Sequence, residues 1–255
     1  MSRISVTAAA GSTIAPPPPR PPHLPLDIDS LPQTAGAPSK ARPYRPVARL
    51  GGWVQGMLVG LAVADVISAI VARDSLDSLV PTDALDAIRV ALFFSLVITG
   101  IVTLSWVHRV TANAQALGAQ SLPYSPTAAV VWWFVPFANL VVPPKVLSKV
   151  AQASHPDYAP GSTLWRSSPK LPIVWMWWVA WLTTRVVDVI VVNSATDGGF
   201  WLTTGGFVLI TGLEVAAMVL GVAVVRKITG DQRHRATRLA RRGLLPLELT
   251  DHRRT

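Results

Sequence analysis

The stretch Ile88 to Val107, which reads IRVALFFSLVITGIVTLSWV, is long and almost wholly apolar. Residues 50–72, 173–194 and 200–225 form three further stretches of the same character. A helix needs about 20 residues to cross the hydrocarbon core of a bilayer, and all four stretches reach that length. The sequence therefore predicts an all-α integral membrane bundle with four transmembrane helices.

Composition agrees with a membrane-embedded chain and excludes several classes of site. Of 255 residues, 50% are hydrophobic and 15% are charged, against about 25% charged in a typical soluble domain. The chain has no cysteine, which excludes disulfides, thiolate catalysis and cysteine-based metal sites. No nucleophile, phosphate-loop or metal-ligand spacing is present. We therefore expect no enzyme activity, no cofactor and no metal, and no nucleic-acid partner despite the net charge of +9.

The chain divides by composition into three parts. Residues 1–46 carry half of the 22 prolines, which favours an extended polyproline or disordered cytoplasmic arm and a docking site for a protein that binds proline-rich segments. Residues 47–229 form the predicted transmembrane domain. Residues 230–255 form a basic cytoplasmic tail, which we expect to attract anionic lipids.

A fifth apolar segment, 125–145, is interrupted by prolines. Ser125-Pro126 has the pattern of a helix start, Pro136 cannot sit inside a continuous helix, and Pro143-Pro144 is expected to end it. A short amphipathic helix is predicted to follow at 145–154. The residues of this interrupted motif are Trp132, Trp133, Pro136, Asn139, Pro143 and Pro144.

Basic residues predict the orientation of the bundle. Positively charged residues flank the cytoplasmic ends of membrane spans. They precede the first stretch and follow the last one: Lys40, Arg42, Arg45, Arg49, Arg226, Lys227, Arg233, Arg235, Arg238, Arg241 and Arg242. Both termini are thus predicted to be cytoplasmic, which requires an even number of crossings. The segment 125–145 is therefore expected to be re-entrant or interfacial, in the plasma membrane.

Four charged residues lie well inside the apolar stretches, at least six residues from either end: Asp65, Arg185, Asp188 and Glu214. A charge at the bilayer centre costs about 2.5–3.5 kcal/mol on insertion scales, so a partner or a water-filled cavity is expected. We expect Asp65 to pair with Arg185 across two helices. This polar cluster has two interpretations: it joins helices, or it lines a cavity that admits an ion, a proton or a small solute.

The stretch from Trp132 to Leu147, WWFVPFANLVVPPKVL, resembles a bacterial family of multi-pass membrane proteins catalogued as domain of unknown function 4328. Trp106, Arg109 and Asn113 upstream fit the same pattern, as does the tryptophan-rich start of the stretch 173–194. The resemblance spans roughly residues 50–230. It implies membrane residence and supplies no catalytic residue.

Two functions fit these observations. The first is a non-enzymatic membrane scaffold or interaction protein whose proline-rich arm and basic tail dock partners. The second is a transporter or channel-like protein that uses the intramembrane charges.

Gly56, Gly60, Ala64 and Ser68 recur every four residues, which predicts close approach of another helix along this stripe.

Overall fold

A computed structural model describes residues 43–73, 82–158, 160–161, 163–194 and 204–245. By its internal contacts the chain divides into two units, Met1–Ser39 and Lys40–Thr255, and every described residue belongs to the second. Most of the predicted proline-rich arm at 1–46 and the end of the predicted tail at 230–255 therefore lie outside the described residues.

Every regular element of the described residues is helical, so the predicted all-α class is confirmed. The long helices include the four predicted apolar stretches except residues 200–203, which lie outside the described residues. The elements are α1 (Ala48–Arg73), α2 (Thr82–Ala116), α3 (Pro126–Val131), η3 (Ala138–Leu140), α4 (Val142–Ser154), η4 (Leu164–Ser167), α5 (Pro172–Ser194) and α6 (Thr204–Arg241).

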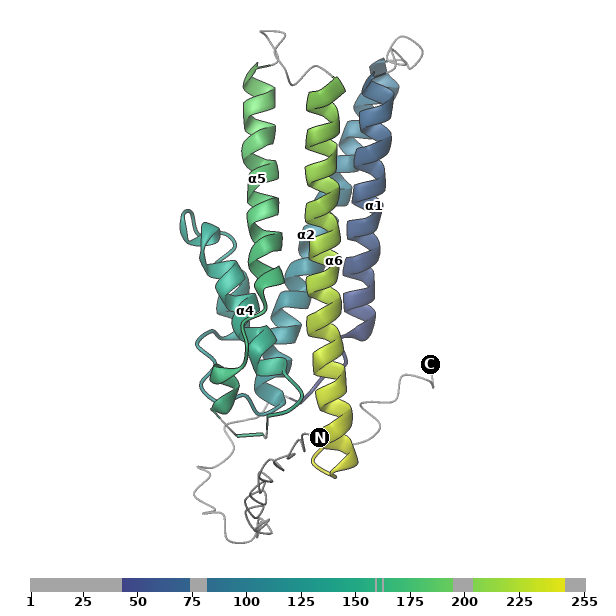
Figure 1. The fold of residues 1–255 in the computed structure, drawn as a ribbon. Helices are drawn as coiled ribbons and strands as arrows, with labels where there is room; N and C mark the ends of the chain where they lie inside the picture. Colours follow the sequence, from purple (N-terminus) through teal and green to yellow (C-terminus); the bar gives the residue numbers. More distant parts are fainter. Residues whose placement is uncertain (1–42, 74–81, 159, 162, 195–203, 246–255) are drawn as a thin grey trace, which may run out of the picture. The chain divides into compact units, whose positions relative to one another are not determined.

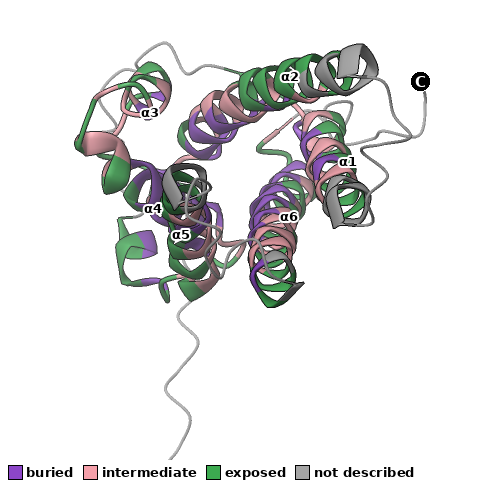
Figure 2. Cartoon of the chain, turned by 90° about the horizontal axis from the view of Figure 1, so that it is seen from above, coloured by how far each residue is buried: buried purple, intermediate pink, exposed green. Residues whose placement is uncertain are grey.

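The four long helices lie side by side and alternate in direction (Figure 1). Helix α6 is the common partner, because both α1 and α5 pack along it, and α2 packs on α1. Helix α4 lies at the end of the bundle where α1 begins and α6 ends. Seen along the bundle, much of the exposed surface of the long helices faces outward (Figure 2).

Large apolar side chains cover the outside of the long helices. Phe93 on α2, Val189 on α5 and Val208 on α6 are each about 60% exposed. Exposed apolar area on this scale indicates a surface that water does not cover. Three of the described helices are long and apolar enough to cross a membrane, at Ala48–Ile67, Val90–Ala116 and Val208–Arg241. The fold therefore suggests a membrane protein, while the fourth predicted span, in α5, stays a prediction.

Helices α2 and α6 continue well beyond the apolar stretches that predicted them. The stretch in α2 was expected to end at residue 107 and that in α6 at residue 225, yet the helices reach Ala116 and Arg241. Both extensions bury one face: Val110, Ala114, Ile228, Ala236 and Leu239 are all buried. Such spacing is that of an amphipathic helix. Together with α4 the extensions form one end of the bundle, called the polar lobe below.

Close helix contacts use other glycines than the predicted stripe. A Cβ at Gly51 would lie 2.7 Å from the Thr229 hydroxyl, and one at Gly221 would lie 2.9 Å from the Trp177 indole nitrogen. Gly56 and Gly60 have no such neighbour among the described residues. The small-residue contacts therefore join α1 to α6 and α5 to α6 at Gly51 and Gly221.

The contact at Gly51 gives a test of this packing. We expect Gly51→Ala to lower the free energy of unfolding by about 1–3 kcal/mol, the usual cost of overpacking, because the Trp106 indole nitrogen donates to Thr229 Oγ1 at 3.1 Å and fixes that side chain. Gly56→Ala is the matched control on the same helix and should not destabilise. Thermal unfolding of the detergent-purified full chain measures both. Equal melting temperatures for the two variants would contradict the close α1–α6 contact.

Candidate functional site

The interrupted segment begins as the sequence predicts. The Ser125 hydroxyl accepts a hydrogen bond from the Ala128 amide at 3.1 Å, and Pro126 occupies the first turn of α3. Helix α3 ends at Val131, with Trp132 as its C-terminal cap. The helix ends here because of Pro136. If the helix continued, the ring of Pro136 would clash with the carbonyl of Trp132, four residues earlier.

Pro143 and Pro144 do the opposite of what the sequence predicted. They were expected to end a helix, and instead they lie in the first turn of α4, which begins at Val142 rather than at Lys145. Proline is tolerated in the first turn because the N–H that it lacks has no partner inside the helix there. Both rings are buried, so the pair also contributes to the contacts of α4.

Between α3 and α4 the chain makes a tight turn. Phe137 has φ of 60°, in the left-handed region that non-glycine residues seldom adopt, and its ring is 85% exposed. The Asn139 amide donates to the Val135 carbonyl at 2.9 Å. The side-chain oxygen of Asn139 is buried without a hydrogen-bond partner among the described residues.

Trp178 of α5 holds this turn in place. Its indole nitrogen donates to the Leu140 carbonyl at 2.8 Å, and its ring meets Trp133 edge-on at 5.4 Å and stacks on Trp181 at 4.9 Å. The side chain is only 1% exposed. The cluster of tryptophans at the start of this stretch is evident in the sequence, but their bond to the interrupted segment is not.

Gln232 lies at the centre of the polar lobe and is fully buried. Its side-chain nitrogen donates to the Val110 carbonyl at 2.7 Å and to the Ser154 hydroxyl at 3.0 Å. Its side-chain oxygen accepts a hydrogen bond from the side-chain nitrogen of Asn113 at 3.4 Å. One side chain of α6 therefore contacts both α2 and the C-terminal end of α4. The sequence analysis did not identify it, since an isolated glutamine in a basic segment gives no signal.

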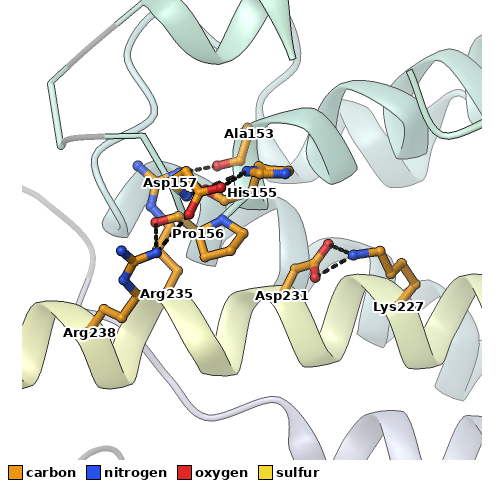
Figure 3. Close-up of polar contacts among 8 residues, drawn as sticks. All are labelled: Ala153, His155, Pro156, Asp157, Lys227, Asp231, Arg235 and Arg238. Atoms are coloured by element: carbon orange, nitrogen blue, oxygen red, sulfur yellow. Dashed lines mark hydrogen bonds and ion pairs between the residues drawn. The ribbon is translucent and has the colours of Figure 1, made fainter. Parts of the chain in front are cut away.

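Arg235, one turn further along α6, is 1% exposed although it was counted in the basic tail. Its guanidinium donates to the Ala153 and His155 carbonyls at the end of α4 (Figure 3). The last carbonyls of a helix have no partner within it and carry partial negative charge. Arg238 extends the contact, since it meets the Asp157 carboxylate at 2.8 Å.

Asn113 joins the N-terminal segment to the polar lobe. Its side-chain oxygen accepts from the Arg45 amide at 3.1 Å, and its nitrogen donates to the Arg45 carbonyl at 2.7 Å. Tyr44 is buried beside this clamp, and burial raises the pKa of its phenol although the Arg233 charge acts in the opposite direction. Residues 43–46, which the sequence assigned to the arm, therefore pack on the domain.

The predicted intramembrane charges lie on three helices. Asp65 is on α1, Arg185 and Asp188 are on α5, and Glu214 is on α6. Arg185 Nη2 lies 4.0 Å from Glu214 Oε1, so the structure gives Arg185 a partner on α6. The predicted pair of Asp65 with Arg185 stays a prediction, and the Asp188 side chain lies outside the described residues.

These arrangements serve mainly to connect helices. Within the described ranges, no group of three or more His, Asp or Glu side chains is placed to hold a metal ion. The buried polar side chains of the lobe point at backbone carbonyls and at one another. Buried hydrogen-bond networks of this kind fix relative helix positions.

Comparison with known proteins adds one finding. A family model described as Domain of unknown function (DUF4328) matches residues 82–230, which runs from the start of α2 to the polar part of α6 and covers more than half of the 255 residues. No curated protein and no solved structure matches the chain.

The Asn113 clamp can be tested by hydrogen exchange. We expect Asn113→Ala to raise the exchange rate of the Arg45 amide and to cost about 1–3 kcal/mol of stability, because buried donors and acceptors lose their partners. Gln115→Ala, an exposed position on the same helix, is the control. Exchange measured by mass spectrometry reports both. Unchanged protection of Arg45 in Asn113→Ala would show that the clamp does not hold this segment.

Proposed function

The chain belongs to the DUF4328 family, and from this membership and its exposed apolar helices we propose a multi-pass integral membrane protein that acts as a scaffold without enzyme activity. The observation that carries the proposal is the contrast between two parts of one bundle. Large apolar side chains face outward along the long helices, while polar side chains are buried in the lobe at one end. The first part suits lipid and the second suits water.

We include α5 as a fourth span. It has 23 residues, which at about 1.5 Å per residue exceeds the roughly 30 Å hydrocarbon core. Met176, Val179 and Val186 are each more than half exposed on it. In water, exposure of these apolar side chains would cost free energy, and contact with lipid removes that cost.

The contacts of the polar lobe support an even number of crossings. The C-terminal end of α2, at Val110 and Asn113, and the C-terminal end of α4, at Ser154, meet at Gln232. A segment that leaves one end of a bundle and returns to it does not traverse the membrane. This favours a re-entrant or interfacial position for residues 125–145, where the exposed ring of Phe137 would enter lipid. The basic residues then place the lobe and both termini in the cytoplasm of a plasma-membrane protein.

A scaffold role follows from what the polar groups do. Gln232, Arg235 and Asn113 spend their hydrogen bonds on joining helices, which leaves a rigid cytoplasmic lobe. In this proposal the proline-rich arm and the tail beyond α6 present the docking surfaces, the arm to a protein partner and the tail to anionic lipids.

The Arg185–Glu214 pair favours a second candidate function, a transporter or channel-like protein for a small solute or ion. Charged side chains within spans often mark ion and proton pathways. The Arg185 side chain is 45% exposed and that of Glu214 is 18% exposed. The scaffold proposal treats the same pair as a contact between α5 and α6.

Cysteine labelling tests the topology, since the chain has no native cysteine. We expect Thr163→Cys, at an exposed position, to react with a membrane-impermeant maleimide only after intact cells are opened. Asp197→Cys, in the predicted outer loop, is the control and should react in intact cells. Labelling of residue 163 from outside would contradict a segment 125–145 that returns to the cytoplasmic side.

A double-mutant cycle separates the two functions. Under the scaffold proposal, Arg185→Gln and Glu214→Gln each lower stability, and the double variant recovers about 0.5–3 kcal/mol of the summed loss because the two side chains interact. Thermal unfolding of the full chain measures the cycle. Additive losses would contradict the pair. A proton flux into pyranine-loaded proteoliposomes that Glu214→Gln abolishes would replace the scaffold proposal with the transporter.

A further inference from the structure

We infer that the polar lobe contains a binding pocket for a phosphate group, at the junction of the N-terminal segment and α2. The pocket has a volume of about 330 Å³ and is lined by Pro43, Arg45, His108, Arg109, Ala112 and Asn113. Its lining brings together two arginines that are 64 positions apart in the chain. It is separate from the Arg185–Glu214 pair and from the interrupted segment.

The pocket is held in shape by the Asn113 clamp. Both backbone groups of Arg45 bond to the Asn113 side chain, at 3.1 and 2.7 Å, and Asn113 is itself buried and bonded to Gln232. Pro46 follows Arg45 directly and restricts its backbone further. The backbone under Arg45 is therefore fixed beside Arg109 before any ligand arrives, which lowers the entropic cost of binding.

The charge of the pocket favours an anion. Arg185 and Arg238 each have a carboxylate partner, whereas in the described part of the chain neither Arg45 nor Arg109 has a carboxylate within 4.0 Å of its guanidinium. Two arginines that have no carboxylate partner in the described part of the chain thus line one pocket. Guanidinium presents paired N–H donors that match the oxygen atoms of a phosphate group.

The position of the pocket relative to the proposed membrane spans indicates which kind of molecule carries the phosphate group. Arg109 lies two residues after the apolar stretch of α2 ends at Val107, and Arg45 lies three residues before α1 begins. In the bilayer arrangement proposed above, both positions lie at the level of the cytoplasmic lipid headgroups. The lipid source rests on that proposed function, while the phosphate chemistry rests on the pocket alone, so inorganic phosphate must be compared with a lipid.

The experiment uses the full chain in a neutral detergent, titrated separately with dihexanoyl-phosphatidylglycerol, dihexanoyl-phosphatidylcholine and inorganic phosphate. Calorimetry gives the affinities, and melting temperatures without ligand confirm folding. Arg45→Gln with Arg109→Gln removes the two pocket charges. Arg49→Gln with Arg226→Gln removes two exposed charges outside the lining, at a similar expected depth. Arg109→Lys keeps the charge but not the paired donors.

We expect phosphatidylglycerol to bind the wild type and the Arg49/Arg226 variant alike, and the Arg45/Arg109 variant about tenfold or more weakly, with Arg109→Lys in between. Equal losses in the two double variants would overturn the pocket in favour of diffuse cationic attraction. Binding of inorganic phosphate as tight as that of phosphatidylglycerol, lost only in the Arg45/Arg109 variant, would support the pocket and overturn the lipid source. No binding of any probe to the wild type would overturn both, and would leave the topology from cysteine labelling unaffected.

Discussion

The buried amide of Gln232 is the constraint on which the polar lobe depends. A buried amide group that lacks a hydrogen-bond partner costs free energy, so each of its three hydrogen bonds must be present for the lobe to be stable. Those bonds fix α6 against the Val110 carbonyl of α2 and the Ser154 hydroxyl of α4, and through Asn113 they reach the backbone of Arg45. The same network of hydrogen bonds therefore fixes the positions of three helices and the N-terminal segment relative to one another.

Helix α6 connects this constraint to the rest of the bundle. In its first half it meets α1 and α5 at small residues such as Gly221, against which the Leu58 and Trp177 side chains lie. Close packing at small residues is typical of helices that associate in lipid. In its second half Gln232 and Arg235 add hydrogen bonds to carbonyl groups, beside buried apolar side chains such as Leu239. One continuous helix thus packs by two kinds of interaction, and this change coincides with the change in the exposed surface.

The sequence predicted what depends on local chemistry. Runs of apolar residues predicted the long helices, and Ser125-Pro126 predicted the start of α3, because both signals act within a few residues. Pro143-Pro144 was misread, since proline both ends one helix and begins the next, and only the chain after it decides which. The bond from Trp178 to the Leu140 carbonyl and the role of Gln232 could not be predicted, because they join positions 38 and 122 residues apart.

The burial of Arg235 reduces the exposed positive charge from which the orientation of the bundle is predicted. A positive residue that bonds to helix carbonyls within a folded lobe contributes less to the charge at the membrane surface than an exposed one does. Arg226, Arg233, Arg241 and Arg242 remain exposed on α6 or directly after it, and Asp231, the acidic residue among them, pairs with Lys227 at 2.7 Å. The excess of positive charge at this end therefore survives when the buried arginine is left out. The exposed positive charge from which we propose a cytoplasmic lobe and the hydrogen bonds that build the lobe come from different faces of the same helix.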